Sequence, residues 1–342
     1  MAPTSTNARD TAHVHRIAPR VVRVELPLPL PDLKVINAYI IEGGTGITLV
    51  DPGWSTAESE GLLLAALHGL GYSRSDVQRI LVTHAHWDHY TLAVKWRDEL
   101  GAELMLGAGE RHSIEAFDAA EGIHPVQRQM LLRAGAPELA RVIAQTPWEP
   151  YEDNAPFDPP DRWLHGGERI DCGGTQILAR ATPGHTRGHI VYTDESAGLA
   201  FTGDHLLPRI TPSIAFERTP EPLPLRSFLD SLRLFTDLPD HRMLPAHGGV
   251  DNTTAVRAAE LIEHHRERLT AVADLVARRG SATAYDIAAQ MRWTRHDRAI
   301  AELNPIHRMV AVLEVMAHLD LLVHRGELAA DDSEPVAQFT VA

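Results

Sequence analysis

The stretch of sequence that most constrains this chain is "THAHWDHY" at residues 83–90. It places three histidines and an aspartate directly after the apolar run "RILV", whose β-branched residues predict a strand. Imidazole nitrogens and carboxylate oxygens are the ligands that borderline divalent ions such as Zn²⁺ prefer. We expect a loop between this strand and a helix beginning at Tyr90 to present four ligand side chains: His84, His86, Asp88 and His89.

Three later motifs carry the same kind of residue. "ATPGHTRGH" contains His185 and His189, "FTGDH" contains Asp204 and His205, and "LPAHGG" contains His247. Each motif follows a predicted strand and lies beside Gly or Pro. In both halves of the chain one strand ends in aspartate and a later one in histidine. This repetition predicts two related sheets that face each other, with the ligand loops meeting at one end of the sandwich.

Together these motifs resemble the metallo-beta-lactamase superfamily, whose pattern is HxHxDH followed by a distant His, a distant Asp and a final His. The resemblance covers about residues 20–250 and implies an α/β fold, an αββα sandwich that binds two divalent ions. Thr91 departs from the glycine that the family often has two places after its last loop histidine. This predicts a slightly different start of the helix with no ligand lost. By the resemblance, the first ion is held by His84, His86 and His185, the second by Asp88, His89 and His247, and Asp204 bridges them.

The aspartate at position 204, in place of a cysteine, makes the chain similar to glyoxalase II-like and ribonuclease-like hydrolases rather than to the antibiotic-degrading lactamases. Two divalent ions, Zn²⁺ with Mn²⁺ or Fe as alternatives, would lower the pKa of a shared water and give a bridging hydroxide nucleophile. They would also stabilise charge that develops on a scissile carbonyl oxygen. Asp88 has a predicted catalytic role besides ligation, because it could orient the hydroxide and protonate a poor leaving group.

Five more residues are candidates for supporting the ligands or lining the pocket. Asp51, at the end of "ITLVD", could accept a hydrogen bond from a ligand imidazole, or could simply form a turn before a proline. Trp87 and Tyr90 flank the ligands and belong either to the pocket or to the core. His189 and His205 are either pocket residues or structural ones.

Periodicity divides the chain into two predicted domains. Residues 1–250 form the catalytic domain, with a hairpin over residues 37–51 and a following helix that Ser55 would cap through capping-box spacing to a glutamate. Residues 108–165 combine helical segments with a Pro-rich piece. We interpret them as an insertion that covers one face and roofs an apolar acyl pocket.

Residues 251–330 form a predicted helical domain that resembles the winged-helix extension of the lactamase-beta-like group, with "LLVHRGELAA" as a small wing. Such domains suggest DNA binding, but the basic residues here are interleaved with Asp286, Asp297 and Glu302. We therefore favour packing on the catalytic domain, or on a second subunit in a homo-oligomer. The last residues, 331–342, are predicted to be a disordered tail.

Composition limits the partners. The chain has 46 acidic and 32 basic residues and a formal charge of −14, which disfavours nonspecific nucleic-acid binding. No apolar run reaches the roughly 20 residues of a membrane span, and the first residues lack the apolar centre of a secretory signal. We expect no membrane association and a cytoplasmic location. The one cysteine, Cys172, excludes an internal disulfide and is predicted to be a core thiol.

The leading hypothesis is a dinuclear metal-dependent hydrolase that cleaves a thioester, or a related activated ester, of a small organic acid. A lactonase shares every motif and stays an alternative. A metal-dependent endoribonuclease of the lactamase-beta-like type is favoured by the helical C-terminal part and opposed by the charge. A binding module that uses the metal structurally is a third hypothesis, which the full ligand set opposes.

Overall fold

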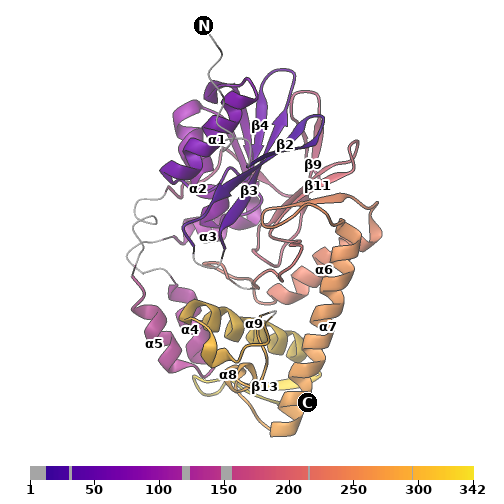
Figure 1. Ribbon diagram of the computed structural model, residues 1–342. Coiled ribbons are helices and arrows are strands. Elements are labelled where there is room, and N and C mark those ends of the chain that lie inside the picture. Colours follow the sequence, from indigo (N-terminus) through magenta and orange to yellow (C-terminus); the bar gives the residue numbers. More distant parts are fainter. Residues whose placement is uncertain (1–12, 31–32, 118–123, 148–155, 215, 295) are drawn as a thin grey trace.

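Two β-sheets face each other in the upper part of the molecule (Figure 1). The computed structural model describes residues 13–30, 33–117, 124–147, 156–214, 216–294 and 296–342. The first sheet has the strand order β1-β2-β3-β4-β5-β6-β7 and the second has the order β12-β11-β10-β9-β8. The first sheet contains β1 (Val14–Ala18), β2 (Val21–Pro27), β3 (Val35–Glu42), β4 (Ile47–Val50), β5 (Val77–Leu81), β6 (Glu103–Gly107) and β7 (Arg162–Leu164). The second contains β8 (Arg169–Asp171), β9 (Gln176–Ala181), β10 (Ile190–Asp194), β11 (Leu199–Gly203) and β12 (Arg242–Pro245).

Alternating side chains along the strands build three apolar layers. On β5, Ile80 packs under the helices that cover the first sheet, while its neighbour Leu81 points into the space between the sheets. On β10, Tyr192 faces that same space and Val191 faces the helices on the other side. This arrangement arises because successive side chains of a strand point to opposite faces of the sheet. The predicted αββα sandwich is confirmed.

Helices form the outer layers of the sandwich. The helices α1 (Ala57–Gly69) and α2 (Trp87–Leu100) cover the first sheet, and α6 (Pro224–Asp237) and the long α7 (Thr254–Arg279) lie against the second. The predicted hairpin is confirmed as β3 and β4, which pair antiparallel. The predicted cap is wrong by one residue, because Thr56 caps α1 by accepting a hydrogen bond from the Ser59 amide at 3.2 Å.

The inserted helices pack differently from our interpretation. The helices α4 (Pro125–Arg133) and α5 (Pro137–Ala144) contribute Leu131 and Leu139 to the same apolar cluster as the C-terminal helices. They therefore pack on α9 (Pro305–His324), in the lower part of Figure 1, and do not simply roof the sheets. The interval also includes a core element, since β7 pairs with β6. Its remaining described elements are short: η2 (Ala108–Glu110) and α3 (Arg111–Glu115).

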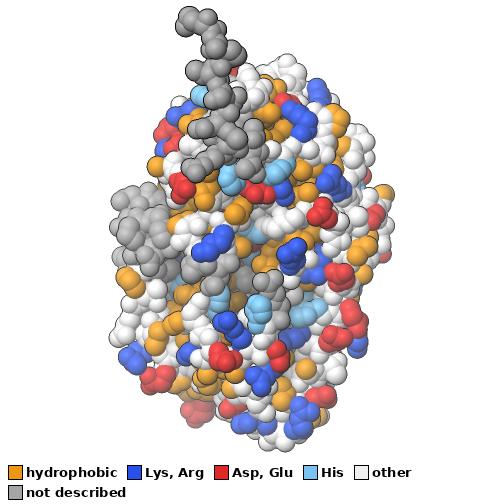
Figure 2. Space-filling model, in the orientation of Figure 1, with side chains coloured by type: hydrophobic (Ala, Val, Ile, Leu, Met, Phe, Trp, Pro, Cys, Tyr) orange, Lys and Arg blue, Asp and Glu red, His pale blue; other side chains and the backbone are white. Residues whose placement is uncertain are grey.

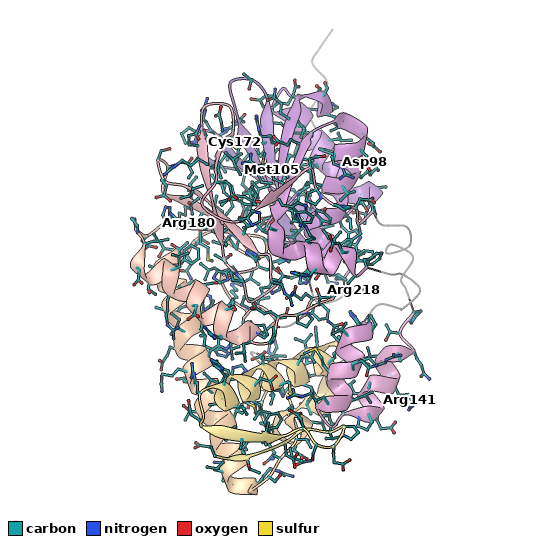
Figure 3. The ribbon with its side chains drawn as sticks, turned by 180° about the vertical axis from the view of Figure 1, so that it is seen from behind. Asp98, Met105, Arg141, Cys172, Arg180 and Arg218 are labelled. Carbon is teal, nitrogen blue, oxygen red and sulfur yellow. The ribbon has the colours of Figure 1, made fainter. Side chains whose placement is uncertain are left out.

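The lower, helical part contains α4, α5, α8 (Ala284–Ala288), α9 and the end of α7. Seen from behind, Arg141 lies in this part, whereas Cys172 and Met105 lie in the sheet part (Figure 3). Cys172 is buried between the sheets, as the core-thiol prediction expects. The domain limits at residues 250 and 251 stay a prediction. The apolar cluster that contains α7 and the inserted helices also contains residues of the sheet part, so it crosses this limit.

The prediction of a disordered tail is wrong. Residues 331–342 include β14 (Gln338–Val341), which pairs antiparallel with β13 (Leu328–Asp331). Phe339 is fully buried, and its backbone exchanges hydrogen bonds of 2.9 Å and 3.1 Å with Ala282. Only β13 overlaps the stretch predicted as a wing, residues 321–330, whereas β14 lies in the predicted tail. The winged-helix assignment itself stays a prediction.

Among the described residues, no helix combines the length and the apolar character that a membrane crossing requires. The cytoplasmic location stays a prediction.

Replacement of Phe339 by alanine tests the role of the C-terminal strand. Because the ring is buried in the apolar cluster of the helical part, Phe339→Ala should lower the free energy of unfolding by about 3–5 kcal/mol. Val341 on the same strand is 56% exposed, so Val341→Ala should change the free energy of unfolding by only about 0.5 kcal/mol. Denaturant unfolding measures both. Equal effects of the two variants would contradict the packing described here.

Candidate metal centre

All seven predicted ligands lie at one end of the sandwich, beyond the ends of strands. His84 and His86 follow β5, His185 follows β9, and Asp204 and His247 follow β11 and β12. The helix begins earlier than predicted, at Trp87 instead of Tyr90, so that Asp88 and His89 occupy the first turn of α2. The structure brings these residues together in two groups, each of which could hold a metal ion. The groups are His84, His86, His185 and Asp204, and Asp88, His89 and His247.

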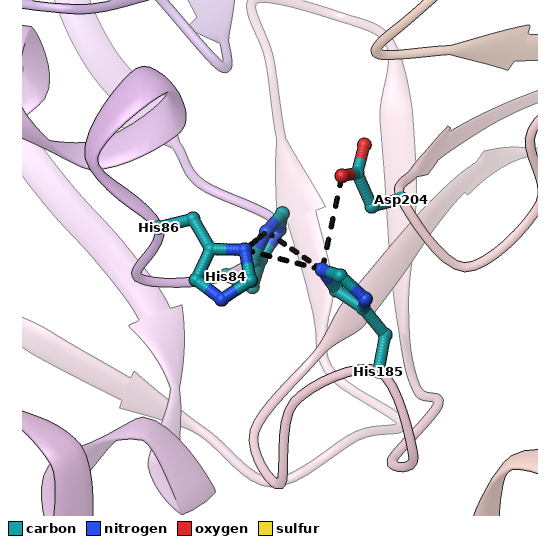
Figure 4. Close-up of side chains that lie close together, drawn as sticks. All are labelled: His84, His86, His185 and Asp204. Carbon is teal, nitrogen blue, oxygen red and sulfur yellow. Dashed lines mark hydrogen bonds and ion pairs between the residues drawn. The ribbon is translucent and has the colours of Figure 1, made fainter. Parts of the chain in front are cut away.

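In the first group, three imidazole nitrogens face one another (Figure 4). The distance from His84 Nε2 to His86 Nδ1 is 2.9 Å, and His185 Nε2 lies 3.3 Å and 3.2 Å from these two atoms. The opposite nitrogens have acceptors: His86 Nε2 donates to the Phe216 carbonyl at 2.7 Å, and His185 Nδ1 donates to the Ser213 carbonyl at 2.8 Å. These hydrogen bonds leave lone pairs on the nitrogens that face inward.

His84 has the same arrangement. The Thr83 hydroxyl donates to Asp51 Oδ2 at 2.8 Å and can therefore accept from His84 Nδ1 at 3.1 Å. Three lone pairs then converge with no proton between them, which is unfavourable unless a cation lies among them. A tetrahedral zinc ion with bonds of about 2.0–2.1 Å separates its nitrogen ligands by about 3.3 Å. The inward nitrogens therefore fit a divalent ion in both chemistry and spacing.

In the second group, Asp88 and two histidines converge. His89 Nδ1 donates to Asp51 Oδ2 at 2.9 Å, and His247 Nδ1 donates to the Val35 carbonyl at 2.8 Å. Their Nε2 atoms are buried without a hydrogen-bond partner among the described residues. They lie 3.7 Å and 3.3 Å from Asp88 Oδ2. Buried polar atoms are rarely left unpaired, so these orphaned nitrogens indicate that the site takes a cation.

Asp204 lies between the groups. Its Oδ2 is 3.7 Å from His185 Nε2, and its Oδ1 is 3.4 Å from His247 Nε2. The preceding Gly203 has a φ of +50°, and a Cβ atom there would lie 2.5 Å from the Thr83 hydroxyl. The glycine thus lets the chain turn closely past the ligand loop. A carboxylate with one oxygen toward each group has the geometry of a bridging ligand.

The electrostatics of the two groups differ. Burial lowers the pKa of His84 well below its usual value and that of His185 to about 4, so these imidazoles stay neutral. Burial acts in the same direction on His89, but Asp88 and Asp51 outweigh it and raise its pKa to about 10. Without metal, His89 therefore holds a proton among carboxylates. The second group attracts positive charge, which a divalent ion would supply when bound.

The five additional candidates fall into different places. Asp51 contacts the ligand His89 and also accepts from the Thr83 amide at 2.8 Å. His189 accepts from the Asp204 amide at 3.2 Å, so it supports the loop that carries Asp204. His205 contacts the rings of Phe228 and Phe235, and its ring centroid lies 5.8 Å from that of His189.

The two aromatic candidates stand next to Asp88 and His89 in the chain. Trp87 stacks on Phe157 with ring centroids 6.2 Å apart and meets Phe117 at 6.0 Å. Tyr90 is fully buried, and its hydroxyl donates to the Asp158 carbonyl. Thr91, the departure from the family pattern, is buried and donates to the Trp87 carbonyl at 2.8 Å. It removes no ligand, as expected.

Sequence reasoning missed the backbone carbonyls of Val35, Ser213 and Phe216, which orient three of the ligand histidines. No side-chain pattern marks a carbonyl acceptor, so no sequence signal could have found them. It also missed two buried glutamates beside the ligand loops, Glu110 and Glu217.

The sequence profile of the metallo-beta-lactamase superfamily matches residues 31–247, more than half of the chain. This chain belongs to the metallo-beta-lactamase superfamily. The match begins just before β3 and ends on the last predicted ligand, His247. It therefore includes every strand from β3 to β12 and both candidate ligand groups, whereas β1 and β2 precede it.

Two solved structures resemble the whole chain. A metallo-beta-lactamase family protein from Thermus thermophilus is 28% identical with a TM-score of 0.74, covering 96% of this chain and 100% of that one. A beta-lactamase domain protein from Burkholderia ambifaria is 27% identical with a TM-score of 0.80, covering 96% and 94%. The superfamily fold in these proteins thus includes a counterpart of most of the helical part.

Two of the relatives have named activities that bear on the chemistry. An atrochrysone carboxyl ACP thioesterase from Passalora fulva is 23% identical over 290 residues, which is 81% of this chain and 69% of that protein. The hydroxyacylglutathione hydrolase GloC from Haemophilus influenzae is 30% identical over 128 residues, 37% of this chain and 49% of that protein. The superfamily membership predicted from the motifs is confirmed.

The contact between Asp51 and His89 gives a test of ligand orientation. Asparagine tolerates the positive φ of 48° at position 51, but its amide group would meet the donors of Thr83 and His89. Asp51→Asn should weaken metal binding by about 10-fold to 100-fold. Competition with a chelator measures this affinity. Asp194 is also buried but caps a turn at Ser196, and Asp194→Asn should leave the affinity unchanged.

Proposed function

We propose that this protein is a dinuclear metal-dependent hydrolase that cleaves a thioester, or a related activated ester, of a small organic acid. The observation that carries the proposal is the position of Asp204, whose two oxygens face two groups of buried, inward-pointing ligands. All seven residues would act as ligands, with Asp204 shared. Zn²⁺ suits this set of imidazoles and carboxylates, and Mn²⁺ or Fe are alternatives.

Two bound divalent ions would supply a nucleophile from water near neutral pH and Lewis acidity for the carbonyl. The chain's own contribution is orientation and proton transfer. Burial alone would raise the pKa of Asp88, but His89 and His247 hold it well below its usual value, so this carboxylate is ionised. It can accept a proton from the attacking water and return it to the leaving group. Asp51 holds His89 in one tautomer, so its Nε2 stays available as a ligand.

A thioester is favoured because its leaving group is a thiolate, which departs without a proton. The Passalora fulva relative is named an ACP thioesterase and the Haemophilus influenzae relative a hydroxyacylglutathione hydrolase, and these names support hydrolysis of an activated acyl group here. A lactonase remains the nearest alternative, since it would use the same ligands. The aromatic rings of Trp87, Phe117 and Phe157 contact one another, Trp87 directly precedes Asp88 in the chain, and such an apolar cluster would suit an acyl part.

The endoribonuclease alternative has less support. The formal charge of −14 opposes binding to a phosphate backbone. On the face drawn in Figure 2, basic side chains are interspersed with acidic ones and form no continuous basic stripe. Helix α9, which a winged helix could use for recognition, is buried along most of its length. We further propose a small-molecule acyl partner and a cytoplasmic location. The helices are proposed to pack on the catalytic part or between copies of the chain.

A substrate panel tests the proposed bond class. The purified protein is incubated with acyl-CoA esters, lactones and single-stranded RNA, with and without added Zn²⁺. We expect thioester hydrolysis that chelator dialysis abolishes and Zn²⁺ restores, together with about two bound ions per chain by elemental analysis. Asp204→Asn should abolish turnover, whereas Asp98→Asn, on the exposed face of α2, should not. RNA cleavage without thioester turnover, or full activity after chelation, would refute the proposal.

Asp88→Asn separates proton transfer from metal binding. If Asp88 protonates the leaving group, turnover of an oxygen ester should fall about 100-fold further than turnover of the matching thioester. Any loss of metal lowers the turnover of both substrates equally. The ratio of the two kcat/KM values therefore reports the contribution of proton transfer alone. An unchanged ratio would leave Asp88 with a role in ligation alone.

A further inference from the structure

Two buried carboxylates lie beside the ligand loops without belonging to either ligand group. Glu110, the last residue of η2, is 1% exposed, and Glu217, which follows the His86 acceptor Phe216, is 5% exposed. Neither is a member of the metal-binding groups found among the described residues. Burying a carboxylate is costly, and a position that needed only packing would be filled by an apolar side chain. Their contacts therefore call for a specific explanation.

Glu110 contacts both loops of the first ligand group. Its carboxylate accepts a hydrogen bond from the Thr186 hydroxyl, next to His185. The backbone amides of Ala85 and Gly188 also stabilise its charged form and oppose the effect of burial on its pKa, and Ala85 lies between His84 and His86. A Cβ atom on Gly188 would lie only 2.1 Å from the Glu110 amide, so the two segments are in direct contact. One side chain thus joins the two segments that carry the three histidines.

Glu217 contacts the same loop, next to the residues that Glu110 contacts. Its Oε1 accepts from the Arg187 amide at 3.0 Å, two residues after His185, and its Oε2 accepts from the Ser113 hydroxyl at 3.4 Å. The preceding carbonyl, that of Phe216, accepts from His86. The Gln127 side chain, buried on α4, donates to the Glu217 carbonyl. Through this last bond, the segment that orients His86 is connected to the inserted helices that pack on α9.

We propose that Glu110 and Glu217 are positioning residues, a carboxylate brace that fixes the spacing between the His84–His86 loop and the His185 loop. The brace lets three lone pairs stay 2.9–3.3 Å apart before an ion binds. It thereby lowers the cost of organising the site on metal binding. The inference rests on the metal binding in the proposed function and is independent of the substrate.

The test uses the full-length metal-free protein and titration with Co²⁺, whose visible absorption reports the geometry of its ligands. Glu110→Gln and Glu217→Gln keep the side-chain volume but present an amide to backbone donors. Each should weaken the first Co²⁺ equivalent by about 10-fold to 100-fold and change its absorption spectrum. Zn²⁺ affinity from chelator competition should fall in parallel. If Glu110→Gln does not fold, Thr186→Val removes one hydroxyl donor to the same carboxylate and should give a smaller loss in the same direction.

The control is Glu314→Gln. Glu314 is also a buried carboxylate, 9% exposed, but it lies on α9 and faces Arg268 at 3.7 Å. Its replacement should alter thermal stability and leave Co²⁺ affinity and absorption unchanged. Wild-type Co²⁺ affinity and spectrum in both brace variants would refute the brace and leave the proposed function untouched. An equal loss of Co²⁺ affinity in Glu314→Gln would do the same. A wild-type protein that binds neither Co²⁺ nor Zn²⁺ would overturn the proposed function together with it.

Discussion

Each of the five histidines predicted as ligands is fixed by a hydrogen bond from the ring nitrogen that faces away from the site. The acceptors are a hydroxyl for His84, a carboxylate for His89, and backbone carbonyls for His86, His185 and His247. Each bond selects the tautomer whose lone pair points inward. In the first group the result is three converging acceptors with no donor among them, whereas in the second group His89 holds a proton among carboxylates in the absence of metal. Both groups therefore favour positive charge, and the rest of the fold holds their side chains in place.

The two sheets explain how the acceptors come together. Parallel pairing of β4 with β5 and of β11 with β12 brings the ends of these strands to one edge of each sheet. The core between the sheets fixes the distance from one edge to the other. Asp51, at the end of β4, then reaches the loop after β5, and Asp204, at the end of β11, reaches both ligand groups. Residues far apart in sequence therefore meet because sheet packing, and not local structure, sets their separation.

The parts of this arrangement that depend on side-chain chemistry could be predicted from the sequence. The seven candidate ligands and Asp51 are recognisable because imidazoles and carboxylates stand directly after predicted strands. The start of α2 at Trp87, the cap at Thr56 and the carbonyl acceptors were not predictable, since they depend on backbone geometry. The four-residue strand that buries Phe339 is too short for its alternation to stand out from a frayed end.

The inserted helices show why the partner of an amphipathic helix is hard to predict. The apolar residues of α4 and α5 mark a buried face but not the surface that buries it, and that surface belongs to α9, far along the chain. Once packed there, α4 places Gln127 against the carbonyl of Glu217, one residue from the acceptor of His86. The helical part therefore contacts the metal centre through one buried amide and one peptide unit. Packing of α4 on α9 and orientation of the His86 imidazole are thus connected through the hydrogen bond between Gln127 and the Glu217 carbonyl.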